Sequence, residues 1–343
     1  MAASSVLTEI PIRSVDGFRF GHRTDTQGGT GCTAIVAEKG AVGGVDVRGG
    51  APASRETDLL RPENTVDVVH AVMLSGGSMY GLEAASGAAR ALEARGIGLP
   101  VGPAVAPIVC SSCIFDLAFG DPAARPDADA GIEAIDAAFT EDAGSPLAEG
   151  NVGAGTGATV GKLMGPTHAM KGGLGARAFA LGPVQVGAVA AVNACGNVVD
   201  PTTLSPIAGV RATPEGTQIL DMEEAMLGMA AQMSMPLDQP LPRTNTTISC
   251  IVTNAPLTKA QATKVAQMAA DAYAHTIRPT HTTNDGDTVY VLSSGALELP
   301  EGAPELPLDL IGLIATRALE AAIVAGAREA ETLYGVPGAA TLG

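Results

Sequence analysis

The residue of this chain that is best suited to covalent chemistry is Thr246, which stands where a polar stretch meets an apolar run. Asn245 and Thr246 stand directly before residues 247–252, which have the composition of a buried strand. The Thr246 hydroxyl can attack the Asn245 carbonyl and shift the acyl group from nitrogen to oxygen, and water then releases a new N-terminus at Thr246. The freed α-amine, with an ordinary pKa of about 7.7–8.0, can act as base for the hydroxyl. An ordinary strand start is the alternative, because Thr is favoured in strands.

The composition excludes several classes of partner. The 343 residues are 46 % apolar but only 3 % aromatic and contain no Trp, so small side chains must fill the core. The length suits one large domain or two ordinary ones. A net charge of −16 argues against nucleic acid and anionic membranes as partners, because both bind through Lys and Arg.

The cysteines and the N-terminus give no sign of secretion, metal or cofactor. Five scattered cysteines do not form a disulfide framework, and the C-x-x-C spacing of Cys110 and Cys113 lacks a second ligand pair, so we expect buried small side chains there. Residues 1–14 show no signal-peptide pattern, and no uncharged apolar run reaches membrane-spanning length. We therefore expect a soluble, cytoplasmic protein.

Apolar strand-like runs alternate with Ala-rich helical patterns along the chain. The patterns predict strands within residues 33–38, 43–52, 69–74, 107–117, 184–199, 246–252 and 288–292, and helices at 82–95, 127–139, 215–233, 258–275 and 308–334. Such a mixture of apolar elements indicates layered α/β packing with buried sheets. A Pro-rich connector at 234–245 is the kind of exposed linker in which a cleavage site can be reached.

Two glycine-rich turns could bind an anion. Gly76 and Gly77 join a strand to a helix, where exposed amides can hold an oxyanion, although a tight packing turn is the alternative. Residues 151–162 end in Lys162 but do not form a P-loop, because Thr156 replaces the first glycine and Leu163 replaces the final Ser or Thr. Lys162 could equally be a solvated side chain.

Three further polar residues stand in or beside apolar strands. Asn193 interrupts the run at 184–199, and a buried amide there needs partners and can donate to an oxyanion. Asp285 and Asp287 are two residues apart, so they share a face in extended backbone and could orient the Thr246 amine and hydroxyl. A solvated Asp-Gly turn is the alternative for this pair.

Taken together, seven stretches resemble the self-processing family of the DmpA-type β-aminopeptidases and the endo-type nylon-oligomer hydrolase. They are GVDVRGGAP (44–52), LSGGSMYGLEAASG (74–87), IFDL (114–117), GAGTGATVGK (153–162), AVNACGNVVD (191–200), NTTISCIVTN (245–254) and NDGDTVY (284–290). Each stretch is short, but they cover most of the chain in the family's order.

This resemblance implies a four-layer αββα sandwich of the N-terminal-nucleophile type, similar to ornithine acetyltransferase. It implies a precursor cut into chains 1–245 and 246–343, which assemble into homo-oligomers, often tetramers of the cleaved heterodimer. By the same resemblance, Thr246 corresponds to the nucleophile, Asn193 to an oxyanion or substrate-orienting amide, and Lys162 to an active-site lysine. Asp285 and Asp287 correspond to the acidic pair that positions the nucleophile.

The chain departs from the family at two points. The β-aminopeptidases use Ser as the nucleophile, whereas this chain has Thr246. The nylon-oligomer enzyme also uses Thr. Characterised members carry a Tyr in the segment where this chain has Phe115, which has no hydroxyl to donate to an oxyanion. Tyr80, or the amides of residues 76–80, could supply the missing donor.

These features favour an amide hydrolase that acts on small peptides or ω-amino-acid oligomers. The hypothesis needs no cofactor and no metal. Two alternatives stay open at this point: an acyltransferase of the ornithine acetyltransferase type, and a catalytically silent small-molecule-binding protein.

Overall fold

The computed structural model describes residues 6–140, 145–232, 245–298 and 306–342. The strands of the main sheet are β1 (Thr8–Ile10), β2 (Arg19–Asp25), β3 (Thr30–Val47), β4 (Ser54–Arg55), β5 (Val69–Ser75), β8 (Val109–Cys113), β11 (Leu174–Leu181), β12 (Val184–Asn193), β15 (Thr246–Thr253) and β17 (Thr288–Ser293). The helices are α1 (Glu83–Glu93), α2 (Ala128–Thr140), α3 (Met222–Ala231), α4 (Lys259–Ala269), α5 (Asp271–Thr276), α6 (Leu308–Arg328) and α7 (Ala339–Leu342).

Shorter elements complete the described part of the chain. They are the strands β6 (Leu99–Val101), β7 (Ala104–Ala106), β9 (Thr159–Val160), β10 (Met170–Lys171), β13 (Asn197–Val199), β14 (Pro206–Ala208) and β16 (Ile277–Arg278), and the single turns η1 (Ile12–Ser14), η2 (Asp58–Leu60), η3 (Ser78–Leu82) and η4 (Gly153–Gly155).

The ten strands are continuously hydrogen-bonded and fold into two facing sheets, and the long strand β3 takes part in both. The order of the sheet is β1-β11-β12-β15-β17-β3-β5-β8-β4, with β2 paired to β3 off this path. The first half of β3 pairs with β2 and β5, and its second half pairs with β17. The register shifts between Val36 and Ala41, where Gly40 has a φ of +80° that other residues rarely adopt. The strand therefore carries the chain from one sheet into the other.

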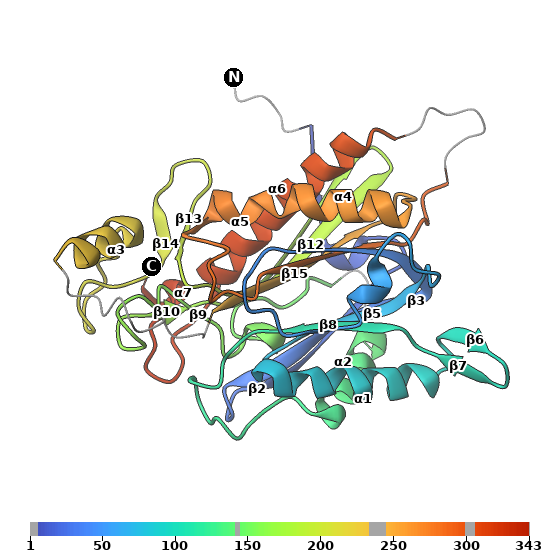
Figure 1. Ribbon diagram of the computed structural model, residues 1–343, viewed down its shortest axis with the longest axis horizontal. Coiled ribbons are helices and arrows are strands. Elements are labelled where there is room, and N and C mark those ends of the chain that lie inside the picture. Colours follow the sequence, from blue (N-terminus) through green and yellow to red (C-terminus); the bar gives the residue numbers. More distant parts are fainter. Residues whose placement is uncertain (1–5, 141–144, 233–244, 299–305, 343) are drawn as a thin grey trace.

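The elements stack in four layers (Figure 1). Helices α1 and α2 cover the β2-β5-β8 side through an apolar cluster that includes Ala88, Leu92 and Ile135. A second cluster lies between the two sheets and joins Phe20 and Leu74 to residues of β12, β15 and β17. A third cluster packs α4, α5 and α6 onto the outer face of β12 and β15. The predicted αββα sandwich is therefore confirmed.

Strand pairing brings three polar strand ends to one edge of the β12-β15-β17 sheet. Strands β12 and β15 are antiparallel with Asn193 opposite Thr246, so β12 ends where β15 begins. Strands β15 and β17 are parallel with Ile248 beside Thr288, so both begin at the same edge. Because side chains alternate along a strand, Thr246 shares the face of Ile248, which lies between the sheets.

Several predicted elements have different bounds in the structure. The helix expected at 215–233 is the shorter α3, capped by the Asp221 carboxylate, and of its residues only Met222 is buried. The stretch 258–275 forms two helices, α4 and α5, and α6 ends at Arg328 rather than continuing to Tyr334. The run 184–199 is divided between β12 and β13. Most of the Pro-rich connector, residues 234–244, lies outside the described residues.

The longest helix, α6, is unusually apolar for its length. By length and hydropathy alone α6 could cross a membrane, but 67 % of its most apolar window is buried inside the protein, as expected of a core helix.

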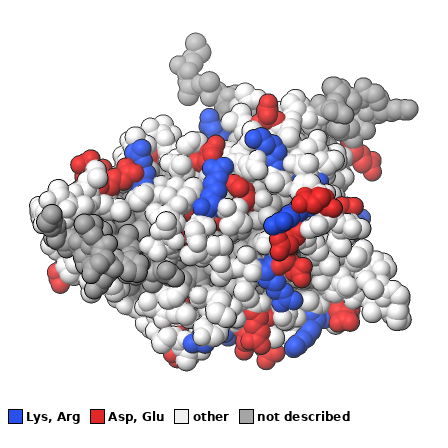
Figure 2. Space-filling model, in the orientation of Figure 1, with Lys and Arg blue, Asp and Glu red and all other residues white. Residues whose placement is uncertain are grey.

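On the face shown in Figure 2, Lys and Arg side chains lie singly or beside Asp and Glu. The five cysteines are all buried and unbridged, in agreement with the packing role expected for them.

Candidate active site

The Asn245–Thr246 peptide is buried at the start of β15. Thr246 is only 4 % exposed, and its hydroxyl donates a short hydrogen bond to the carbonyl oxygen of Asn245. The backbone N–H of Gly286 donates to the same oxygen at 3.2 Å. The carbonyl carbon that the hydroxyl would attack therefore belongs to a group already held by two donors.

Gly286 lies very close to the Thr246 side chain. A Cβ atom at position 286 would stand 2.8 Å from Thr246 Oγ1 and 2.9 Å from the carbonyl oxygen of Ala51. Real Cβ atoms essentially never approach other heavy atoms this closely. Glycine is therefore needed here so that the backbone can reach the Asn245 carbonyl.

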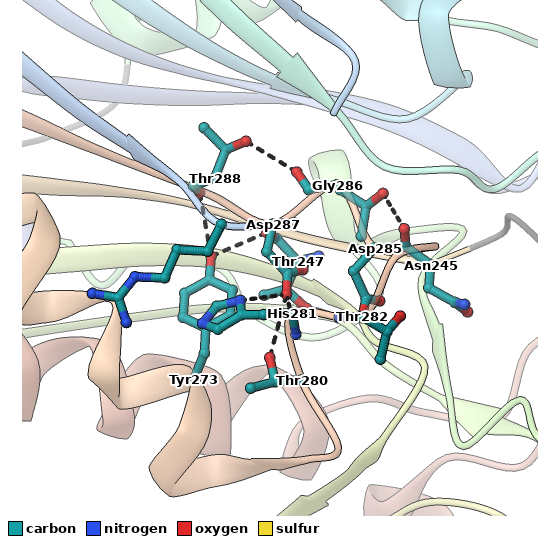
Figure 3. Close-up of polar contacts among 12 residues, drawn as sticks. Asn245, Thr247, Tyr273, Thr280, His281, Thr282, Asp285, Gly286, Asp287 and Thr288 are labelled. Carbon is teal, nitrogen blue, oxygen red and sulfur yellow. Dashed lines mark hydrogen bonds and ion pairs between the residues drawn. The ribbon is translucent and has the colours of Figure 1, made fainter. Parts of the chain in front are cut away.

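Asp287 holds the peptide that follows Thr246 (Figure 3). Its Oδ1 accepts the backbone N–H of Thr247 at 2.8 Å. Its Oδ2 accepts the N–H of His281 at 3.1 Å and the Thr280 hydroxyl at 3.3 Å, and lies 2.9 Å from His281 Nδ1. A carboxylate with this many donors is strongly held, and it fixes the position of Thr247.

Two aromatic residues that the sequence analysis did not single out complete this support. The buried Tyr273 hydroxyl donates to the carbonyl oxygen of Thr247 at 3.1 Å and to that of Thr288 at 3.3 Å. The His281 ring stacks on the Tyr273 ring with centroids 5.3 Å apart. Both backbone polar groups of Thr247 are thus held by side chains. The only sequence signal for His281 was a lone His in a polar loop.

Asp285 occupies a different environment from Asp287. It is 2 % exposed, and its Oδ2 accepts the N–H of Thr282 at 2.7 Å. Its Oδ1 is buried without a hydrogen-bond partner among the described residues. Burial, and then the neighbouring Asp287, raise the pKa of the Asp285 carboxyl above its ordinary value. The two carboxyls of the predicted pair therefore differ in their hydrogen-bond partners.

Asn193 and Lys162 form a second polar group across from Thr246. Lys162 Nζ donates to Asn193 Oδ1 at 2.7 Å and to the Asn193 backbone oxygen at 3.2 Å. Asn193 Oδ1 also accepts the N–H of Thr159 at 3.0 Å, and its Nδ2 donates to the Phe115 carbonyl at 3.0 Å. Burial lowers the pKa of Lys162 to about 7. Lys162 is thus bound into the site rather than solvated at the end of a loop.

In the glycine turn that the sequence suggested as an oxyanion site, the amides of Gly76 and Gly77 are already hydrogen-bonded within the fold. The N–H of Gly76 donates to the Gly31 carbonyl at 2.9 Å, and the N–H of Gly77 donates to Asp116 Oδ1 at 2.6 Å. Tyr80 is 49 % exposed, with the Arg125 guanidinium 3.8 Å from the centre of its ring. These amides are already used in packing, and Tyr80 lies on the surface.

Phe115 does lie beside the site. It lines a pocket of about 220 Å³ together with Lys162 and Thr159. Strand pairing and these contacts place Asn193, Thr246, Lys162, Asp285 and Asp287 around one end of β15. No cluster of three His, Cys, Asp or Glu side chains suited to a metal ion occurs in the described part of the chain.

Comparison with known proteins identifies the family of this chain. The family description "Peptidase family S58" matches residues 11–341. An uncharacterised aminopeptidase of Mycobacterium tuberculosis is 40 % identical over 349 residues, which cover 95 % of this chain and 96 % of the relative. The chain belongs to peptidase family S58. It is accordingly a hydrolase of amide bonds, and the resemblance noted from its motifs is confirmed.

Two further similarities extend the comparison. The 6-aminohexanoate-oligomer endohydrolase of Kocuria sp. is 29 % identical over 340 residues, which cover 93 % of the S58 chain and 89 % of that enzyme. The solved structure of the L-aminopeptidase D-Ala-esterase/amidase of Ochrobactrum anthropi, described as a variant of the Ntn hydrolase fold, superposes with a TM-score of 0.66 at 19 % identity. It covers 95 % of this chain and 88 % of the solved one, and at this identity it shows the shared fold alone.

Proposed function

We propose that this S58 protein cleaves its own chain between Asn245 and Thr246 and then hydrolyses amides with Thr246 as nucleophile. The observation that carries the proposal is the contact of the Thr246 hydroxyl with the Asn245 carbonyl, whose oxygen also accepts the N–H of Gly286. A nucleophile, an adjacent carbonyl and a donor to its oxygen are the three parts that an N-to-O acyl shift requires.

The self-cleavage follows from these parts. Thr246 Oγ1 forms a bond to the Asn245 carbonyl carbon, and negative charge develops on the oxygen that the Gly286 N–H already contacts. The C–N bond to Thr246 then breaks, the nitrogen takes up the proton that Oγ1 has lost, and an ester remains between Asn245 and Oγ1. Water hydrolyses this ester, so that Asn245 becomes a carboxylate and Thr246 a free amine. The products are the chains 1–245 and 246–343.

The new amine would arise beside charges that suit it. Asp285 carries a buried oxygen without a partner among the described residues, and Asp287 already holds the next peptide. An ammonium next to these carboxylates is favoured over one in an apolar site. After losing its proton, the amine is placed to take the proton of its own hydroxyl during attack on a substrate.

Substrate hydrolysis then uses the same groups in two steps. The Thr246 hydroxyl attacks the substrate carbonyl to give an acyl-enzyme and a free amine, and water releases the acid. The Asn193 side chain donates to the Phe115 carbonyl through Nδ2, and an amide N–H is a suitable donor to an oxyanion. Lys162 polarises this amide through Oδ1, which makes Asn193 a stronger donor to the developing oxyanion.

The substrates we propose are small peptides or ω-amino-acid oligomers. The relatives named above are an aminopeptidase and an endohydrolase of 6-aminohexanoate oligomers. We further propose that the cleaved chains stay together in one domain and assemble into a homo-oligomer. Strand β15 supports the first point, because it pairs along its length with β12 of the larger fragment.

Trapping the acyl-enzyme tests the proposed chemistry. The protein is incubated with a p-nitrophenyl ester of a short carboxylic acid, quenched in acid, digested and examined by mass spectrometry. The proposal predicts one added acyl group on the peptide that begins with Thr246, and none in a Thr246→Ala variant. Acyl groups found only on lysines, equally in both proteins, would contradict it. Added amine acceptors separate hydrolysis from acyl transfer, because transfer would give the new amide.

A further inference from the structure

The pocket beside Lys162 has apolar walls. Its apolar lining consists of Phe115, Ala118, Phe119, Pro166, Ala169 and Val336, and we call it the Phe119 pocket. Its volume of about 220 Å³ would hold a short chain of several methylene groups. The charged side chains that line it in the described structure are Asp116 and Lys162.

The only acidic side chain lining the Phe119 pocket, within the described ranges, already accepts a hydrogen bond on each of its carboxylate oxygens. Asp116 is 4 % exposed, and its Oδ1 accepts the N–H of Gly77 at 2.6 Å. Its Oδ2 accepts the Thr30 hydroxyl at 2.7 Å. A substrate ammonium that entered this pocket would therefore meet no carboxylate oxygen that lacks a donor.

The surroundings of the pocket also disfavour the charged forms of two nearby lysines. Lys171 lies behind the wall, with its Nζ 4.4 Å from the centre of the Phe119 ring, and donates to the carbonyl oxygens of Thr156 and Ala158 at 2.8 and 2.6 Å. Burial lowers the pKa of Lys162 and of Lys171 to about 7. The same loss of hydration would act on a substrate ammonium, and any proton on either lysine would repel it.

Asn193 lies between the Phe119 pocket and Thr246. Lys162 contacts Asn193 at two atoms, and Asn193 lies opposite Thr246 across the β12-β15 pair. The backbone carbonyl of Phe115, whose residue lines the pocket, accepts the Asn193 amide. A group attached to Thr246 would lie beside Asn193, whose partners Lys162 and Phe115 line the pocket.

We propose that the Phe119 pocket receives an uncharged, apolar acyl segment of the substrate and rejects one that ends in a free amine. The protein would then cleave amides within a chain, or amides with a blocked amine, in preference to removing residues from a free N-terminus. This inference rests on the proposed function of Thr246. It assigns the acyl-side specificity to Phe119, Ala118 and Val336 together with the occupied Asp116.

A matched pair of substrates tests the inference on the self-cleaved wild-type protein. Hexanoyl p-nitroanilide and 6-aminohexanoyl p-nitroanilide share the same chain length and leaving group, and differ by one terminal ammonium at pH 7. We expect kcat/KM to be at least about tenfold higher for the hexanoyl compound, because a buried ammonium without a partner is costly. Equal values, or a preference for the amine, would overturn the inference while leaving the hydrolase function in place. Turnover of neither compound, with no acyl group on Thr246, would overturn the proposed function and this inference with it.

A variant pair separates charge from shape. Ala118 is exposed at the pocket wall, so Ala118→Asp adds the missing carboxylate, and Ala118→Asn adds the same volume without charge. We expect Ala118→Asp to shift the ratio of kcat/KM at least about tenfold toward the amine substrate, and Ala118→Asn to keep the wild-type ratio. An equal shift in both variants would show that volume rather than charge sets the preference, and would contradict the inference. Self-cleavage of each variant, followed by mass, reports that it has folded.

Discussion

The backbone N–H of Gly286 and the carbonyl oxygen of Asn245 are joined by a hydrogen bond of 3.2 Å. This bond links the turn between the two aspartates to the peptide that we propose is cut. Because the Thr246 hydroxyl contacts the same oxygen, attack at this carbonyl would develop charge where a fixed donor already lies. In the proposed cleavage, the turn at 285–287 would act through its backbone as well as through its carboxylates.

A methyl group at position 286 should slow self-cleavage. The added Cβ of Gly286→Ala would lie 2.8 Å from Thr246 Oγ1, so the hydroxyl or the turn must move and the Gly286–Asn245 bond must lengthen. We expect the rate of cleavage, followed by gel densitometry, to fall by at least about tenfold, since the loss of an oxyanion donor costs about 100- to 1,000-fold in enzymes. Gly228→Ala is the control, because it lies in α3 with no atom within 4 Å of the new Cβ. Equal cleavage rates for the two variants would show that Gly286 plays no part in self-cleavage.

His281 should influence cleavage through Asp287. His281 has a φ of +54°, which Gly and Asn tolerate, so His281→Gly and His281→Asn can be compared without added backbone strain. The Asn side chain keeps a donor for Asp287, whereas Gly removes it. We expect His281→Gly to slow self-cleavage about tenfold and His281→Asn to keep most of the rate. If the two variants cleave equally fast, the Asp287–His281 contact plays no part in positioning Thr246.

The raised pKa of Asp285 gives a prediction for stability. A carboxyl with a raised pKa in the folded state binds its proton more tightly there than in the unfolded chain. Its contribution to the free energy of unfolding is therefore present below the ordinary value of 3.8 and is lost as pH rises through the raised pKa. In an uncut Thr246→Ala background, Asp285→Asn should raise Tm at pH 7, by about 1–2 °C for each kcal/mol relieved in a chain of this length.

Calorimetry at two pH values checks this prediction. The gain from Asp285→Asn should shrink as pH falls toward 4, because the wild-type carboxyl becomes neutral there too. A variant that is less stable than its background at pH 7 would show that the ionised Asp285 is not a strained group in the uncut chain.

The sequence predicted the strands of the site well because they are apolar and bounded by polar turns. Residues 246–252 and 288–292 fall inside β15 and β17, and the Asn193 that interrupts the apolar run is the last residue of β12. The four-layer arrangement came from the family resemblance rather than from the patterns. The dual membership of β3 could not be read from its sequence, because it depends on which strands pair with each half.

The contacts of several site residues could not be predicted, because they depend on distant partners or on irregular loop geometry. Gly76 and Gly77 have the composition of an anion site, but Gly31 and Asp116 occupy their amides. His281 contacts Asp287 only through a local loop geometry that carries no motif. Tyr273 lies in a helical pattern in which an aromatic residue is expected to pack in the core. The hydrogen bond from its hydroxyl to the Thr247 carbonyl depends on α5 packing beside β15.

Intact mass spectrometry of the purified protein beside Thr246→Ala shows whether the chain cuts itself before Thr246. We expect two fragments from the wild type, residues 1–245 and 246–343, and one uncut chain from the variant. A wild type that stays uncut after long incubation at neutral pH would contradict self-cleavage at Thr246. Fragments of the same masses from Thr246→Ala would show that another group cuts the chain, and would contradict the role given to the Thr246 hydroxyl.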